Sequence, residues 1–255
     1  MTPTTVAWIA LGCVFGGALL GMLLRRALPE NHLSSDSKDV IKLGIGLVGT
    51  MSALVISLLI SSAKSTFDTQ NTEVTQSAAN VVLLDRVMAH YGPETRDARE
   101  LLRRITAEWH DQIWPATHAQ PVTLAAVKEG PPPIEAIQDG LRGLVPQTEA
   151  QRQLQAQALQ LAGNMAQTRW LFLGQFGSRG IPVPFLVILV VWLVVIFIGF
   201  GLFAPANPTV IGVLFLCALS AAGAIFLILE MERPFEGLMK ISDAPVRAAL
   251  AHLGQ

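Results

Sequence analysis

Small and polar residues recur along one side of the apolar stretch at residues 43–63, and they continue just beyond it. This polar stripe consists of Gly46, Thr50, Ala53, Ser57, Ser61, Lys64 and Asp68. On a helix, at about 100° per residue, the seven positions fall within an arc of about 80°. Hydroxyl groups can replace part of an ion's hydration shell, and a ring of Lys64 side chains would favour anions at the mouth of a pathway. Because a few helices cannot enclose a pore alone, such a pathway requires a symmetric assembly of chains.

Close packing of helices is a second explanation for the stripe, because small side chains let two membrane helices approach each other. The apolar stretch at residues 6–24 carries two glycine pairs with suitable spacing, Gly12 with Gly16 and Gly17 with Gly21. The stretch at residues 209–229 is also rich in Gly and Ala. The stripe could therefore pack against either stretch, and the residues leave both explanations open.

No other pattern predicts catalysis or ligand binding. Gly44-x-Gly46-x-x-Gly49 has the spacing of a dinucleotide-binding fingerprint, but it opens an apolar stretch and follows no strand, so helix packing explains it better. The potential metal ligands are Glu108, His110, Asp111 and His118. Pro115 separates the two histidines, so they cannot share one helical face. We therefore expect no metal, no cofactor and no catalytic residue, and an enzyme is the least favoured class.

The composition predicts a membrane protein. The chain has 255 residues, of which 51% are hydrophobic and 15% are charged, and its mean hydropathy is +0.47. Soluble domains usually carry about 25% charged residues. The net charge is −1 and no basic cluster is present, which argues against a nucleic-acid partner. Cys13 and Cys217 both lie in apolar stretches, so they form neither a disulfide framework nor a metal site.

Four apolar stretches are long enough to cross a bilayer, since about 20 helical residues span its hydrocarbon core. They cover residues 6–24, 43–63, 183–203 and 209–229. The first has no basic segment before it and no cleavage site after it, so we interpret it as a span rather than a secretory signal. The third is almost wholly aliphatic and aromatic, as expected for lipid contact. Residues 1–63 and 183–229 thus form two transmembrane hairpins.

The rest of the chain predicts an all-α extramembrane domain inserted between the second and third spans, at residues 64–182. Apolar residues recur there at helical spacing, with a break at Gly92 and Pro93 and a loop at residues 115–133. Residues 230–255 form an amphipathic C-terminal segment, whose short helix we expect to begin at an N-cap at Ser242-Asp243.

Charge says little about orientation. With four spans, both termini and residues 64–182 share one side. Near the spans, that side has Lys64, Arg169, Arg179, Arg233 and Lys240, and the other has Arg25, Arg26, Lys38 and Lys42. Five against four is almost no bias under the positive-inside rule. We place the termini and the domain in the cytoplasm mainly because of a family resemblance.

Several segments resemble a family of bacterial bestrophin-like membrane proteins. They are Gly49-Thr50-Met51-Ser52-Ala53-Leu54-Val55, Ser62-Ala63-Lys64-Ser65-x-Phe67-Asp68, Leu84-Asp85-Arg86 with His90-Tyr91-Gly92-Pro93, and Arg233-Pro234-Phe235-x-Gly237 with Ile241-Ser242. The resemblance implies a pentameric anion channel of the bacterial inner membrane, whose second span lines a neck above a helical cytosolic domain. The second span contains no Phe, which bestrophins proper use for a hydrophobic neck.

The leading hypothesis is a homo-oligomeric, bestrophin-like ion channel whose partners are the lipid bilayer and further copies of the chain. The alternative is a membrane-anchored interaction or sensor module that recruits an unidentified protein and conducts nothing. In that case the polar stripe would be buried between the helices of one subunit.

Overall fold

The computed structural model describes residues 2–29, 35–115, 134–177, 183–235 and 237–254, and all the secondary structure in these ranges is helical. The chain divides into two units. Unit 1 comprises Met1–Thr66 and Gly180–Glu232, and unit 2 comprises Phe67–Arg179 and Arg233–Gln255. The expected loop at residues 115–133 lies outside the described residues, apart from Pro115.

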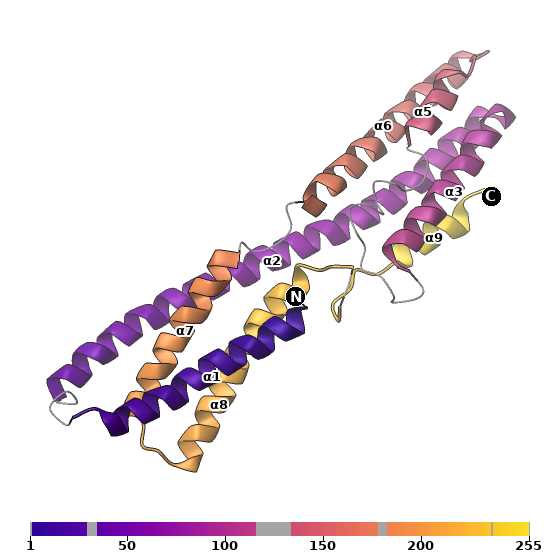
Figure 1. Cartoon of the computed structure of the whole chain (residues 1–255). Helices are drawn as coiled ribbons and strands as arrows, with labels where there is room; N and C mark the ends of the chain where they lie inside the picture. Colours follow the sequence, from indigo (N-terminus) through magenta and orange to yellow (C-terminus); the bar gives the residue numbers. More distant parts are fainter. Residues whose placement is uncertain (1, 30–34, 116–133, 178–182, 236, 255) are drawn as a thin grey trace. The chain divides into compact units, whose positions relative to one another are not determined.

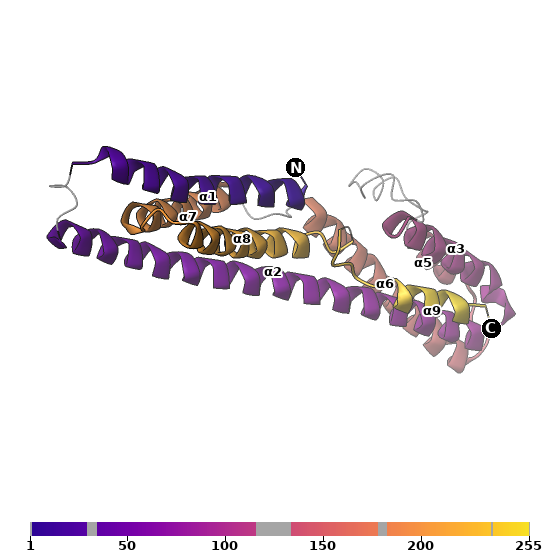
Figure 2. The same ribbon diagram turned by 90° about the horizontal axis from the view of Figure 1, so that it is seen from below.

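Unit 1 contains helices that are long and apolar enough to cross a membrane. They are α1 (Pro3–Ala27), the first part of α2 (Ser35–Tyr91), α7 (Val183–Phe203) and α8 (Pro208–Met231). In both views α1, α7 and α8 lie side by side (Figures 1 and 2). Within the described residues, these four helices confirm the all-α class and the predicted number of spans.

Side-chain caps fix the beginnings of α1 and α8. Thr2 Oγ1 accepts a hydrogen bond from the Thr5 backbone N–H at 3.2 Å, and Asn207 Oδ1 accepts one from the Val210 N–H at 2.9 Å. A proline follows each cap in the first helical turn, where its missing N–H leaves no acceptor unpaired. The turn between α7 and α8 is therefore specified by its own residues.

Glycines bring the backbones of α1 and α7 into contact. A Cβ atom added to Gly17 would lie 3.1 Å from the Val194 carbonyl oxygen, and one added to Gly21 would collide with the Ile198 carbonyl. Gly201 of α7 faces the α1 backbone in the same way. We call this contact, formed by Gly17, Gly21 and Gly201, the glycine seam. It shows that α7 is a packing partner of α1 as well as an apolar span.

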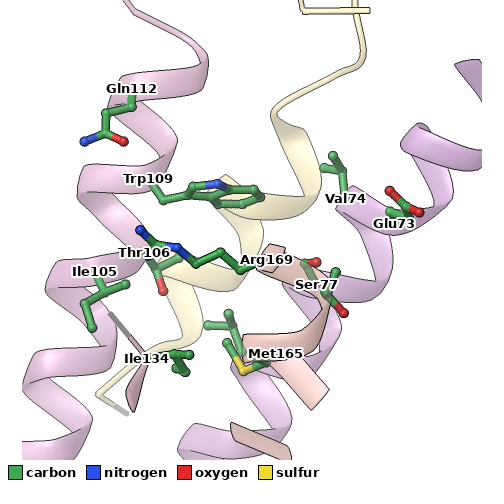
Figure 3. A pocket seen from close by; sticks show the side chains of 12 residues that line it. Glu73, Val74, Ser77, Ile105, Thr106, Trp109, Gln112, Ile134, Met165 and Arg169 are labelled. Carbon is green, nitrogen blue, oxygen red and sulfur yellow. The ribbon is translucent and has the colours of Figure 1, made fainter. Parts of the chain in front are cut away.

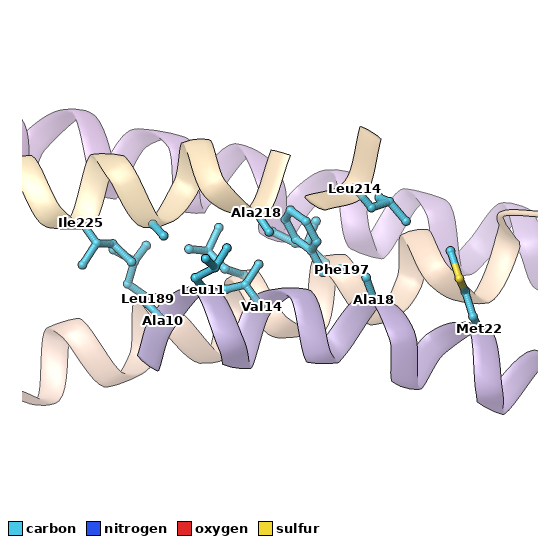
Figure 4. Packing of buried hydrophobic residues seen from close by; sticks show 13 residues of the cluster. Ala10, Leu11, Val14, Ala18, Met22, Leu189, Phe197, Leu214, Ala218 and Ile225 are labelled. Atoms are coloured by element: carbon cyan, nitrogen blue, oxygen red, sulfur yellow. The ribbon is translucent and has the colours of Figure 1, made fainter. Parts of the chain in front are cut away.

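Buried aliphatic residues extend the seam into the core of unit 1. Figure 4 shows them between α1, α7 and α8. They include Ala10, Leu11, Val14 and Ala18 of α1, Leu189, Leu193 and Phe197 of α7, and Leu214, Ala218 and Ile225 of α8. Each fully buried aliphatic side chain contributes about 1.5–3 kcal/mol where water is the reference, and close packing takes over that role inside a bilayer.

Unit 2 is a helical assembly around the second part of α2. Its other elements are η2 (Pro93–Thr95), α3 (Arg96–Ile113), α5 (Glu135–Arg142), α6 (Glu149–Gly177) and α9 (Ala244–His252). α2 ends at Tyr91, and Gly92 follows with a φ of 136°, which side chains other than glycine rarely adopt. The predicted break at Gly92 and Pro93 is therefore confirmed.

A buried ion pair joins α2 to α3 in unit 2. Asp85 is 1% exposed, and it accepts hydrogen bonds from Arg99 Nε at 2.8 Å and Arg99 Nη2 at 2.9 Å. These hydrogen bonds raise the pKa of Arg99 above its usual value, so the guanidinium stays charged. The Gly254 backbone N–H lies 3.5 Å from the same carboxylate, and Leu253 is buried beside it. The segment after α9 thus packs into the core of unit 2.

The predicted helix start at Ser242-Asp243 is confirmed, because Asp243 is the N-cap residue of α9, but its carboxylate does not cap the helix. Asp243 has helical backbone angles and makes no capping hydrogen bond. Its carboxylate lies 3.2 Å from His110 Nε2 and 3.1 Å from Arg247 Nη2, so it links α3 to α9. Ser242 Oγ, not Asp243, accepts from a helix N–H, that of Ala244 at 3.2 Å.

Candidate functional site

All seven residues of the polar stripe are exposed on the surface of α2. Gly46, Thr50, Ala53, Ser57, Ser61 and Lys64 lie in unit 1, and Asp68 lies on the same helix in unit 2. A Cβ atom added to Gly46 would meet nothing within 4 Å. The stripe therefore forms a continuous open face along the part of α2 in unit 1.

The opposite face of α2 holds this helix against unit 1. Its residues pack against the core formed by α1, α7 and α8, and they are Ile45, Val48, Val55, Ile56 and Leu59. Ser52 lies on this side too, 2% exposed, with its hydroxyl donating to the Val48 carbonyl at 2.8 Å. Only 6% of the apolar window of α2 is buried, against 39% for α1. α2 is thus the least enclosed of the four spans.

The packing explanation for the stripe is consequently wrong within one chain. It required the small residues of the stripe to face the first or fourth span, whereas the stripe is exposed and the aliphatic face of α2 packs against the core of unit 1, with Ile45 next to Gly199 of α7. Apolar side chains bury more contact area than Gly, Ala or Ser, which is why the aliphatic face of α2 packs against the core of unit 1. Burial of the stripe between helices of one subunit, as the interaction-module alternative assumed, is not found either.

Hydroxyl groups on the stripe are bonded back to their own helix. Thr50 Oγ1 donates to the Gly46 carbonyl at 2.9 Å, and Ser57 Oγ donates to the Ala53 carbonyl at 2.8 Å. This arrangement satisfies the polar hydrogen and leaves the oxygen lone pairs accessible on the open face. The hydroxyls can therefore accept from water or coordinate a cation as they stand, and they must rotate to donate to an anion.

The two glycine pairs of α1 have different surroundings. Gly17 and Gly21 lie in the glycine seam, whereas a Cβ atom on Gly12 or Gly16 would meet nothing within 4 Å. Both of the latter residues are exposed. Within one chain, only the second pair brings helices together, and packing by Gly12 and Gly16 stays a prediction about a surface outside the subunit.

A row of leucines beside the stripe was missed by the sequence reasoning. Leu43, Leu47, Leu54 and Leu58 are between 64% and 75% exposed, and on the helical wheel they follow directly after the stripe. We call them the leucine ridge. The wheel angles alone would have shown this ridge, but nothing in the sequence distinguishes an exposed leucine from one that packs against the core.

These features define a class: a membrane protein that is helical throughout the described secondary structure and whose second span has an open polar face. A family model, the Bestrophin-like domain, matches residues 12–246. The chain belongs to this Bestrophin-like family.

Solved structures agree with this assignment at the level of the fold. The chain is similar to a bacterial Bestrophin homologue from Klebsiella pneumoniae in two crystal structures, each with a single mutation. One has 14% identity and a TM-score of 0.58, covering 96% of both chains; the other has 15% identity and a TM-score of 0.59, covering 99% of this chain and 97% of that one. No curated protein matches the sequence.

Proposed function

We propose that the protein is a homo-oligomeric ion channel in which the polar stripe of α2 lines the conduction path. One observation carries the proposal: α2 packs against its own subunit through an aliphatic face and leaves Thr50, Ser57 and Lys64 exposed on the other. Polar groups facing lipid are unfavourable, so a membrane helix with such a face needs water or another protein surface beside it. Family membership supports the same reading.

In a rotationally symmetric oligomer, the neighbouring copies would provide the water-filled space and the protein surface that the stripe needs. Around a central axis, the stripe of each copy would face the others across water, and the leucine ridge beside it would pack against the neighbouring copy. Gly46 would allow close approach of the helices, and Lys64 would form a ring of positive charge. Five copies are expected from the family resemblance. The bacterial inner membrane, with residues 64–182 and both termini in the cytoplasm, completes the proposal.

Ion flux through liposomes that contain the purified protein tests conduction. The wild type should carry ions, and Lys64→Glu should shift the anion-to-cation permeability ratio towards cations, because it reverses the charge at the proposed mouth. Lys240→Glu, at an exposed position outside the spans, is the matched control and should leave the ratio unchanged. Absence of flux over a range of voltage, pH and divalent-ion concentration would contradict the proposal.

Thiol labelling tests whether the stripe faces water. Cys13 and Cys217 are first replaced by Ala, and cysteine is then placed at Ser57, at buried Ser52 or at Ser220. Ser220 is exposed in mid-span on α8, away from the stripe, where lipid is expected. A membrane-impermeant, water-soluble reagent should modify Ser57→Cys much faster than the other two. Equal protection of all three in the assembled protein would show that no aqueous path follows the stripe.

A further inference from the structure

Unit 2 contains a pocket that the proposed conduction path does not use. Helices α2, α3 and α6 line it, together with Ile134 immediately before α5, and its volume is about 110 Å³. The walls are mostly apolar, with Val74 and Val81 from α2, Ile105 from α3 and Met165 from α6. Four segments that are distant in sequence thus enclose an apolar hollow.

Two nitrogen donors in this pocket have no partner among the described residues. Figure 3 shows the Arg169 side chain reaching from α6 towards α3, below the ring of Trp109. In the described part of the chain, neither the Arg169 guanidinium nor the Trp109 indole N–H has a hydrogen-bond or ion-pair partner. Both residues are half-buried. At the wall of an apolar pocket, a guanidinium interacts more strongly with an anion than with the water that otherwise solvates it, so these two donors favour an anionic ligand.

The other polar groups restrict which anion fits. Thr106 and Thr168 donate their hydroxyl hydrogens to the Leu102 and Asn164 carbonyls, at 2.8 Å and 3.0 Å, so in this conformation they have no hydrogen to donate to an anion. Glu73 lines the α2 side of the pocket, whereas the guanidinium lies on the α3 side (Figure 3). Arg169 is the only cationic residue in the described lining, so a second negative group on a ligand would find no cation to pair with. The pocket therefore suits a single negative charge.

We propose that this pocket binds a small organic acid with one carboxylate and an apolar body. The carboxylate would take two hydrogen bonds from Arg169, in the geometry that guanidinium groups favour, and could accept a third from the Trp109 indole. An engineered cavity of about 150 Å³ holds benzene, so the apolar body has about four to six carbons. Short-chain fatty acids and benzoate have this chemistry. The site is independent of conduction, because its ligand does not enter the path.

Calorimetric titration of the full-length purified protein with hexanoate and benzoate tests the site. Each acid should bind saturably, and the neutral amides hexanamide and benzamide should bind at least about tenfold more weakly, because they lack the charge that pairs with Arg169. Arg169→Gln should lower the affinity for the acids by about tenfold to hundredfold and leave the affinity for the amides nearly unchanged. Equal affinity for acid and amide would overturn the proposal.

Two further variants guard against trivial explanations. Arg152→Gln removes a guanidinium from the exposed surface of the same helix, where it pairs with Glu149, and should bind the acids like the wild type. Trp109→Phe replaces the indole with a smaller aromatic ring that has no N–H; the protein should stay folded and bind the acids more weakly than the wild type, while the affinity for the amides changes less. Unchanged acid affinity in Arg169→Gln, or an equal loss in Arg152→Gln, would refute the site.

Chain length distinguishes a free metabolite from a fatty acid released by the membrane. Affinity should rise from butyrate to hexanoate and fall for palmitate, whose chain exceeds the cavity. Tighter binding of palmitate than of hexanoate would overturn the assignment to small acids. Acid binding is measured without ion flux, so the two proposals can fail separately. A protein that conducts ions but does not bind the acids would contradict only the pocket proposal, and one that binds the acids but conducts no ions would contradict only the channel proposal.

Discussion

The glycine seam of α1 and the polar stripe of α2 look alike in sequence and differ in the fold. Both place small residues at helical spacing inside an apolar span. At Gly21 the small residue lets a carbonyl of α7 approach, whereas at Gly46 the space above the residue is empty. Among the described residues, the only charged group near the seam is at its end, where Arg25 of α1 donates to the Ala204 carbonyl just after α7, whereas Thr50, Ser57 and Lys64 lie within the stripe itself. Small residues thus mark contact surfaces, and polar companions indicate that the contact is not with the protein's own apolar core.

The largest effect is expected from Gly21→Leu, which tests the contact between α1 and α7. Its Cβ would collide with the backbone of α7, which no rotamer change can relieve, so we expect destabilisation of at least about 3 kcal/mol. Thermal unfolding and the yield of monodisperse protein in detergent measure this effect. Wild-type stability in the variant would mean that α1 and α7 do not meet at this glycine.

Gly46→Leu is the partner experiment on the open face. The subunit has room for the side chain, so the free energy of unfolding of the dissociated protein should not fall by more than about 0.5 kcal/mol. Assembly or flux should nevertheless be lost, because the leucine would occupy the space near the axis. Native mass spectrometry and liposome flux report the two properties separately. Normal assembly together with normal flux would place Gly46 on a lipid-facing surface.

Thr50→Val has a smaller expected effect. It keeps the shape and removes one hydroxyl that is bonded only to its own helix, so stability should change by less than about 0.5 kcal/mol. Conduction should fall, since one polar group per subunit leaves the path. Flux relative to Ser220→Ala, which removes a hydroxyl bonded in the same way on α8, isolates the effect of position. Equal flux in the two variants would argue against a role for Thr50.

The smallest effect on the subunit is expected from Gly12→Leu. This glycine has open space around it, so the stability of the isolated subunit should hardly change. If α1 contacts a neighbouring copy through Gly12 and Gly16, the variant should weaken the oligomer by a measurable amount. Dissociation in a detergent series measures this change. An unaltered oligomer would assign the Gly12 surface to lipid.

Much of the fold could be predicted because its signals are local. Apolar length predicts the four spans, and the Gly92-Pro93 pair predicts the end of α2, where the structure has a φ of 136°. The partner that each helix face packs against is not determined by local sequence. α7 has no polar side, so nothing in its sequence shows that it packs against Gly17 and Gly21 of α1. The role of Asp243 was missed for the same reason, since its partner His110 lies on another helix.

The candidate site was predictable in part. The spacing of the stripe identified its members, and the structure adds that all of them are exposed on a single chain. The pocket in unit 2 could not be predicted from the sequence. Val74, Ile105 and Arg169 come from three separate helices, and each fits the ordinary pattern of its own helix. Only the fold brings the Arg169 guanidinium near the Trp109 indole.

The glycine seam also has a consequence for synthesis. The chain emerges from the ribosome in order, so α1 enters the membrane long before Ile198 and Gly201 of α7 exist. At about 5–20 residues per second, the interval is roughly ten to forty seconds. During this time Gly17 and Gly21 remain without the helix they fit, open to insertion chaperones or to the wrong helix of another nascent chain. We expect the yield of correctly formed protein to depend on translation speed between the second and third spans.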